Sequence, residues 1–204
     1  MEKFRTGEYI AMGLEKKVYE DPEDPDKVIG LYHFSDESAE RIKRQFYLTK
    51  ILHLLFSKNI PDIHLVTLEP HTVRKQRVET DEIHQIIQRS VEQLIDSSLS
   101  DMSTNQRSVQ EAKNKIYAND KYIAFVRSMR DLGVSLDMSA VNFTFDKDGN
   151  IVYLDDIDPD GAFSIIKFSE EKFRQAINRI LDKGIKRQSL HYLERYIELS
   201  KKHP

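Results

Sequence analysis

The stretch that most constrains the fold of this 204-residue chain runs from Gly133 to Pro159, with the sequence GVSLDMSAVNFTFDKDGNIVYLDDIDP. Two short runs rich in β-branched and aromatic residues, Phe143–Asp146 and Ile151–Leu154, flank a polar segment that contains Gly149. This pattern predicts a β-hairpin. Because a hairpin is stiff, it fixes the relative position of the groups at its outer end.

Oxygen-bearing side chains stand on both sides of this predicted hairpin. Asp137 and Asn142 precede it, and Asp155 and Asp156 follow it. Carboxylate and amide oxygens that are held by the backbone can converge on a hard cation and a phosphate. The alternative interpretation is an ordinary hairpin with polar loop ends, since Asp and Asn are common turn residues.

The same stretch resembles the catalytic loop and metal-binding segment of the protein-kinase-like superfamily, which includes the aminoglycoside and choline kinases. The superfamily pattern is Asp-x-x-x-x-Asn, a hairpin with a glycine turn, and the Asp of an Asp-Phe-Gly signature. Asp137, Asn142, Gly149 and Asp155 match it in order. The resemblance implies that Asp137 orients or deprotonates an attacking hydroxyl, while Asn142 and Asp155 hold Mg²⁺ against the phosphates of ATP.

Two positions depart from that pattern. Ser135 stands where the superfamily usually has a His, two residues before the catalytic Asp. The signature triplet reads Asp155-Asp156-Ile157 instead of Asp-Phe-Gly.

The first part of the chain resembles the amino-terminal lobe of such a kinase. Three strands are predicted at residues 8–12, 16–20 and 27–34, followed by a helix over 36–58 that Ser35 caps, and by an antiparallel strand pair at 63–68 and 72–78. The helix would correspond to helix C of the kinase lobe.

The resemblance implies a set of nucleotide-binding residues in this lobe. Anchoring the glycine-rich pattern G-x-G-x-x-G-x-V on Val18 puts Gly13 at the middle glycine and Lys16 at the third. Val28 lies on the third predicted strand, and Glu79 lies in the segment whose backbone would bind adenine. The implied nucleotide-binding residues are thus Gly13, Lys16, Val18, Val28 and Glu79.

The lysine that grips ATP in this superfamily has no direct counterpart. Gly30 stands at its position, and Lys27 should point to the opposite face of the strand unless the alignment is shifted by one residue. Lys16 occupies the position from which the with-no-lysine kinases supply their lysine, or it is an exposed hairpin residue. The predicted helix C also lacks a mid-helix Glu, which indicates a rewired site or an inactive one.

The remaining segments predict helices at 81–99, at 109–132 with Gly133 as its C-cap, and at 169–182 and 187–201, the last two separated by Lys183-Gly184. We therefore expect an α+β, two-lobed protein-kinase-like fold. Residues 1–79 would form the amino-terminal lobe with its antiparallel sheet and helix C, and residues 80–204 a reduced, mainly helical carboxy-terminal lobe, with ATP and Mg²⁺ in the cleft.

The composition of the chain limits the classes of partner and chemistry that we expect. The net charge of −3 argues against a nucleic-acid binder, and the absence of Cys excludes thiol chemistry and disulfides. No run of residues predicts a membrane span or a signal peptide, so a cytoplasmic protein without a membrane partner is expected. Residues 167–204 carry 10 Lys or Arg against 5 Asp or Glu, which we interpret as the solvated face of helices, with docking to a partner or an anionic surface as the alternative.

Three functions remain open from the sequence. The first is an ATP- and magnesium-dependent phosphotransferase acting on an unidentified hydroxyl-bearing acceptor. The second is a pseudokinase that binds nucleotide or a protein partner as a regulatory module. The third is a structural α+β protein whose hairpin matches by chance.

Overall fold

The computed structural model describes residues 7–12, 16–24, 27–32, 36–68, 71–77, 113–157 and 168–202. Contacts between Cα atoms group the chain into two compact units. The first unit combines Met1–Val78 with Glu170–Pro204, and the second unit is Glu79–Ser169. The chain therefore leaves the first unit, builds the second, and returns to the first.

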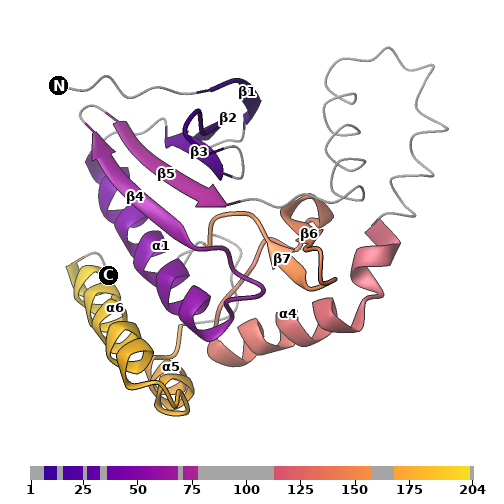
Figure 1. The fold of residues 1–204 in the computed structure, drawn as a ribbon. Helices are drawn as coiled ribbons and strands as arrows, with labels where there is room; N and C mark the ends of the chain where they lie inside the picture. The colour runs from indigo at the N-terminus through magenta and orange to yellow at the C-terminus, as the bar shows by residue number, and fades with distance from the viewer. Residues whose placement is uncertain are drawn as a thin grey trace. The chain divides into compact units, whose positions relative to one another are not determined.

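The first unit is built on a five-stranded antiparallel sheet. Its strands are β1 Tyr9–Met12, β2 Lys16–Glu20, β3 Lys27–Tyr32, β4 Ile63–Leu68 and β5 His71–Arg77, in the spatial order β1-β2-β3-β5-β4 (Figure 1). These bounds confirm the five predicted strands to within two residues at each end. The sheet and its helices also confirm a mixed class of helices and antiparallel strands.

Helix α1, Asp36–Leu55, contributes the core of the first unit. The buried apolar side chains Ile42, Leu48, Ile51 and Leu52 recur at helical spacing along it. The helix ends three residues before the predicted Lys58, because the chain already turns at residues 57–59. The predicted cap, Ser35, lies outside the described residues.

Lys50 ties α1 to the first residues of β4. Its ammonium forms an ion pair with Asp62 and donates a hydrogen bond to the Ile63 carbonyl at 3.3 Å. The side chain of Lys50 is only 11% exposed, whereas that of Asp62 is 41% exposed. The pair therefore satisfies a nearly buried cation at the point where the helix meets the sheet.

Helices α5, Glu170–Asn178, and α6, Lys183–Lys202, complete the first unit. The prediction that Lys183-Gly184 separates them is wrong, because both residues belong to the first turn of α6. Asp182 begins this helix instead. Its Oδ1 accepts a hydrogen bond from the Ile185 backbone N–H at 2.8 Å, and its carbonyl accepts one from the Lys186 N–H.

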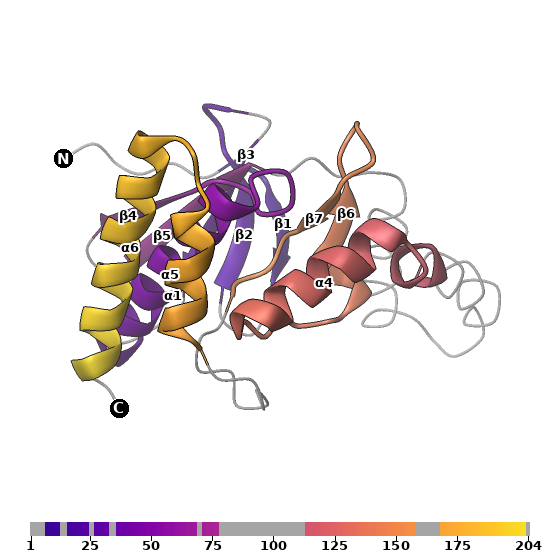
Figure 2. The same cartoon turned by 90° about the horizontal axis from the view of Figure 1, so that it is seen from below.

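Helix α6 lies beside α1 in two perpendicular views (Figures 1 and 2). The Tyr192 ring packs against Tyr47 with centroids 6.1 Å apart, and the Arg195 guanidinium lies over the same Tyr47 ring. Leu193, Tyr196 and Leu199 are buried. Residues 170–204 thus group with the first unit, whereas the sequence-based division assigns them to the second lobe.

The second unit contains helix α4, Asp120–Leu132, and a hairpin of β6 Phe143–Phe145 and β7 Ile151–Tyr153. The hairpin and the end of α4 confirm the prediction. A continuous helix from 109 to 132 is wrong, because Asn119 is extended and separates helical residues 113–117 from α4. The Asn119 side chain caps α4 by accepting hydrogen bonds from the N–H groups of Lys121 and Tyr122. The predicted helix at 81–99 lies outside the described residues.

Candidate functional site

The candidate site begins where α4 ends at Gly133. This glycine has φ 80° and ψ 29°, a left-handed conformation in which it has little steric cost. Its N–H bonds the Arg130 carbonyl at 3.0 Å, and the Val134 N–H bonds the Met129 carbonyl at 2.9 Å. These two hydrogen bonds form a Schellman motif, which stops the helix and directs the chain into the following loop.

The loop after Gly133 alternates between buried and exposed residues. Val134, Leu136 and Ala140 are buried, whereas Asp137 and Met138 are exposed. The apolar residues anchor the backbone in the unit. Asp137 is consequently presented to solvent from a backbone that is fixed on both sides.

Hydrogen bonds hold Asp137 in a defined orientation. Its N–H donates to the hydroxyl of buried Tyr153 at 3.2 Å, and its Oδ1 accepts from the Ser139 N–H at 2.9 Å. The side chain of Asn142 donates from Nδ2 to the Asp137 carbonyl at 3.3 Å. Within the described part of the chain, the side-chain hydrogen bond of Asp137 is made by Oδ1 and not by Oδ2.

The hairpin brings the third predicted residue to the same end. β6 and β7 are antiparallel, with Phe143 opposite Tyr153, and the Leu154 N–H donates to the Asn142 carbonyl at 2.8 Å. Asp155 follows Leu154 directly and is half-buried. A hydrogen bond therefore joins Asp137 and Asn142. Asp155 is the next residue after Leu154, whose N–H bonds the Asn142 carbonyl.

Aromatic packing supports this arrangement from within the second unit. The Phe143 ring lies 4.9 Å from Tyr122 and 5.1 Å from Tyr153, between centroids. Burial raises the pKa of Tyr122 to about 12, and neighbouring Tyr117 adds to the rise. The Tyr117 hydroxyl donates to the Met138 carbonyl at 3.1 Å. Two tyrosines, Tyr117 and Tyr153, thus hold the loop that carries Asp137.

The far end of the hairpin is closed by Asp146. Its Oδ1 accepts from the N–H groups of Asp148 and Asn150, and its Oδ2 accepts from the Asn150 amide at 2.8 Å. Burial alone raises the pKa of Asp146, but these hydrogen bonds and the charge of Lys121 outweigh it and lower the pKa. The Lys121 ammonium also donates to the Gly149 carbonyl at 2.7 Å, which fastens the turn to the start of α4.

Sequence reasoning did not identify Tyr153 or Lys121 as residues that support the site. Neither residue stands out in the sequence. An aromatic residue on a strand usually belongs to the core, and a lysine on a helix usually faces solvent. Among the described residues, no group of three or more His, Cys, Asp or Glu side chains is arranged to hold a metal ion.

Four of the five predicted nucleotide-binding residues, Gly13, Lys16, Val18 and Val28, belong to the first unit, whereas Glu79 is the first residue of the second unit. Val18 is opposite Gly30 and Glu20 is opposite Val28 in the β2–β3 register, so Val18 and Val28 share one face of the sheet. Lys16, two residues before Val18 on β2, is opposite Tyr32 of β3. Gly13 and Glu79 lie outside the described residues.

Lys27 lies on the other face of β3, as predicted. The strand runs without a bulge, so Lys27 alternates with Val28 and shares the face of Ile29, which is fully buried. Its ammonium lies 2.7 Å from the Asp24 carboxylate. Lys27 and Val28 therefore face opposite sides of the sheet.

Similarity between this chain and known proteins is low. No protein-family model matches the sequence, and no curated protein matches it. Among solved structures, the chain is similar to a mutant of aminoglycoside 2'-phosphotransferase-IIIa in complex with GDP, at 13% identity and a TM-score of 0.34. The similarity covers 95% of this chain and 82% of that one. A TM-score this low carries no argument about fold or function.

Proposed function

We propose that this chain is an atypical kinase of the protein-kinase-like superfamily, which transfers the γ-phosphoryl group of ATP to a hydroxyl-bearing acceptor. The observation that carries the proposal is the fixed end of the hairpin in the second unit. There Asn142 bonds the Asp137 carbonyl, Tyr153 holds the Asp137 N–H, and Leu154 connects Asp155 to Asn142 through the backbone.

In the proposed reaction Asp137 accepts the proton of the acceptor hydroxyl. The hydroxyl oxygen then forms a bond to the γ-phosphorus, and the bond from that phosphorus to the β–γ bridging oxygen breaks, so that ADP leaves. The hydrogen bond from Ser139 orients one carboxylate oxygen of Asp137, and the other is the proton acceptor.

The donor set at Asn142 and Asp155 fits Mg²⁺. Because Nδ2 of Asn142 donates to the Asp137 carbonyl, its amide oxygen is the atom left to act as a ligand, and Asp155 offers a carboxylate. Both are hard oxygen donors, which Mg²⁺ prefers. When bound, Mg²⁺ would neutralise charge on the phosphates. We assign nucleotide contacts to Gly13, Lys16, Val18, Val28 and Glu79.

The competing function is a pseudokinase, a regulatory module that binds nucleotide or protein without transferring phosphate. Gly30 favours it, because this residue stands where a catalytic lysine is expected and is flanked in the register by Val18 and Arg74. The two functions make different predictions for turnover and for nucleotide binding.

Substitution of the proposed base, Asp137, should distinguish a kinase from a pseudokinase. We expect Asp137→Asn to lower ATP turnover by about 10²- to 10⁴-fold, since it removes general-base catalysis but leaves the loop contacts of the backbone. Turnover is measured as release of ADP from the full chain with ATP and Mg²⁺. Asp148→Asn is the matched control, because it makes the same change in the exposed turn of the same hairpin and should leave turnover unchanged.

A thermal-shift measurement of nucleotide binding tests the pseudokinase function. We expect ATP to raise the melting temperature more with Mg²⁺ than without it, and Asp155→Asn to abolish that difference. A shift without any turnover in the unsubstituted chain would establish the pseudokinase. Turnover that is the same in Asp137→Asn and in the unsubstituted chain would exclude the mechanism above.

A further inference from the structure

The connection between α5 and α6 exposes an apolar side chain at its tip. Leu181 is 97% exposed, and Ile185, in the first turn of α6, is 40% exposed. In the same two helices Phe173, Ile177 and Leu193 are buried. A single exposed Leu is common on protein surfaces, so its meaning depends on its surroundings.

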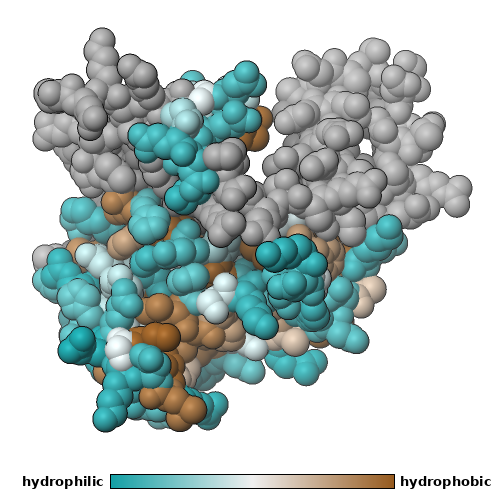
Figure 3. Space-filling model, viewed as in Figure 1, coloured by the Kyte–Doolittle hydropathy of each residue, from teal (hydrophilic) through white to brown (hydrophobic). Residues whose placement is uncertain are grey.

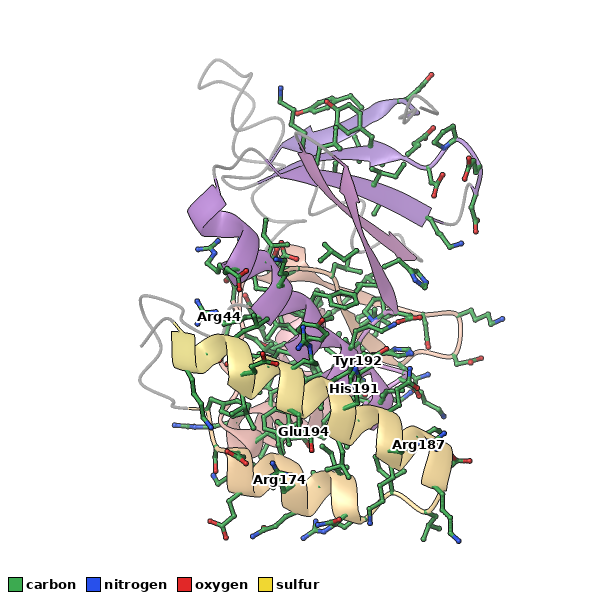
Figure 4. The ribbon with its side chains drawn as sticks, turned by 90° about the vertical axis from the view of Figure 1, so that its left-hand side faces the viewer. Arg44, Arg174, Arg187, His191, Tyr192 and Glu194 are labelled. Atoms are coloured by element: carbon green, nitrogen blue, oxygen red, sulfur yellow. The ribbon has the colours of Figure 1, made fainter. Side chains whose placement is uncertain are left out.

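Basic residues flank Leu181 on both sides in the sequence. Arg179 precedes Leu181, and three more cations follow it within six residues: Lys183, Lys186 and Arg187. Arg179, Lys183 and Arg187 are exposed. Figure 4 shows Arg187 at the end of α6 that joins α5. In Figure 3 apolar residues reach the surface at the lower edge of the view, where α5 meets α6.

The one carboxylate in this segment, that of exposed Asp182, caps α6. Asp182 Oδ1 accepts from the Ile185 N–H, and the Asp182 carbonyl accepts from the Lys186 N–H. With four basic residues and one Asp, residues 179–187 carry a net charge of +3, although the whole chain has a net charge of −3.

Backbone hydrogen bonds hold the tip in its shape. The Ile180 N–H donates to the Ile177 carbonyl at 3.0 Å, and the Arg179 N–H donates to the Ala176 carbonyl at 3.1 Å. The Lys186 ammonium bonds the Asn178 carbonyl at 3.3 Å and so connects the two helices across the turn. A surface that docks through this tip would not have to order it first.

We propose that residues 179–187, which we call the α5–α6 tip, dock this protein on an anionic membrane surface. Leu181 and Ile185 would enter the boundary between headgroups and acyl chains, while the exposed side chains of Arg179, Lys183 and Arg187 contact lipid phosphates and carboxylates. Exposed apolar side chains flanked by cations fit a lipid interface. A nucleic acid would satisfy the cations but leave Leu181 in water.

This proposal goes beyond the proposed phosphotransfer and does not depend on it. It concerns peripheral binding: none of the helices in the described ranges is long and apolar enough to cross a bilayer. It replaces the sequence-based expectation that no membrane is a partner, and it takes up the anionic-surface alternative that the basic carboxy-terminal charges leave open.

The absence of Trp from the chain allows a direct test. Leu181→Trp introduces a single indole at the tip, and Ile123→Trp introduces one on α4 in the second unit, where Ile123 is 41% exposed. With vesicles of phosphatidylcholine and phosphatidylserine, we expect the fluorescence of Leu181→Trp to shift to the blue and to be quenched by brominated acyl chains. Ile123→Trp should show neither change.

Charge and apolar substitutions complete the experiment by vesicle sedimentation. Lys183→Glu and Arg187→Glu should each lower the partition coefficient by about fivefold or more, and Leu181→Asp by about tenfold or more. Lys147→Glu, in the exposed hairpin turn of the second unit, is the matched charge control and should change binding little. Raising salt from about 0.1 M to about 1 M should release the protein, because the screening length falls from about 10 Å to about 3 Å.

Three results would overturn the proposal. The first is equal partitioning onto phosphatidylcholine vesicles with and without phosphatidylserine. The second is binding that Leu181→Asp and Lys183→Glu leave unchanged. The third is no binding at all at low salt, which would direct the search to an acidic protein partner. Circular dichroism of each variant checks its fold, and exposed positions such as these should leave it intact.

Discussion

The ion pair between Lys50 and Asp62 shows how one residue joins two elements of the first unit. The nearly buried ammonium of Lys50 needs a partner, and the Asp62 carboxylate and Ile63 carbonyl supply it. Burial alone raises the pKa of Asp62, but the hydrogen bond and the charge of Lys50 outweigh it, with His53 and His64 adding to the effect. The pKa of Asp62 is therefore lowered on folding.

The lowered pKa of Asp62 determines how the stability of the protein changes with pH. A carboxyl whose pKa is lowered by folding stabilises the protein above its unfolded pKa, and this contribution is lost as the pH falls through the folded pKa. Asp62→Asn should lower the free energy of unfolding at pH 7 by about 1–2 kcal/mol, a figure reduced because the Asp62 side chain is 41% exposed. The difference from the unsubstituted chain should shrink below about pH 4.

Urea unfolding followed by circular dichroism at a series of pH values measures this difference. Asp24→Asn is the matched control, since its partner Lys27 is 37% exposed whereas Lys50 is 11% exposed, so the change should cost about 0.5 kcal/mol or less. An Asp62→Asn deficit that stayed constant or grew in acid would contradict the assignment of the pair as a folded-state ion pair.

Among the elements, the end of α4 determines where the candidate site begins. Gly133 adopts φ 80°, which costs a residue with a Cβ about 1–2 kcal/mol. We expect Gly133→Ala to lower stability by about that amount and to reduce ATP turnover, because a shifted helix end moves the loop that carries Asp137. Gly133→Asn should retain more of both, since Asn tolerates this conformation better.

Parallel measurements of melting temperature and ADP release on the two variants check this prediction. If Gly133→Ala and Gly133→Asn both had the melting temperature and ADP release of the unsubstituted chain, the left-handed conformation at the helix end would not matter to the site.

Most elements could be predicted because their signals are local. Gly133 stops a helix, Gly149 sits in a hairpin turn, and β-branched and aromatic residues mark β2 and β3. The break at Asn119 could not be predicted, because its neighbours are equally compatible with a continuous helix and the cap depends on two hydrogen bonds to α4. Gly184 suggests a break between helices, but capping by Asp182 outweighs the low helix propensity of one glycine.

The supporting contacts of the site could not be predicted from spacing. The Tyr153 hydroxyl reaches Asp137 across 16 positions of sequence, and Lys121 reaches Gly149 across 28. Lys50 and Arg44 look like ordinary solvated helix residues, yet both are buried. Such contacts depend on three-dimensional packing, whereas the order of acidic and amide residues along a hairpin can be read from the sequence alone.

For the whole molecule, the division into units predicts where a core substitution is felt. Leu193 on α6 is fully buried in the first unit, and Met129 on α4 is 1% exposed in the second. Leu193→Ala should cost about 2–5 kcal/mol and reduce hydrogen-exchange protection of α1 while the hairpin at 143–153 retains its protection. Met129→Ala should do the reverse.

Hydrogen exchange with peptide resolution distinguishes these outcomes. Equal loss of protection in α1 and in the hairpin, for either variant, would mean that both units unfold as one cooperative body, and the division by contacts would then have no energetic counterpart.

The return of α6 to α1 also has a consequence for synthesis on the ribosome. α1 emerges more than a hundred residues before the helix that covers it, so its apolar side chains must wait for the last part of the chain to be translated. The intervening unit is contiguous and can reach its final structure during that interval. Translation therefore sets an order of assembly in which the inserted unit is finished before the one that surrounds it in sequence.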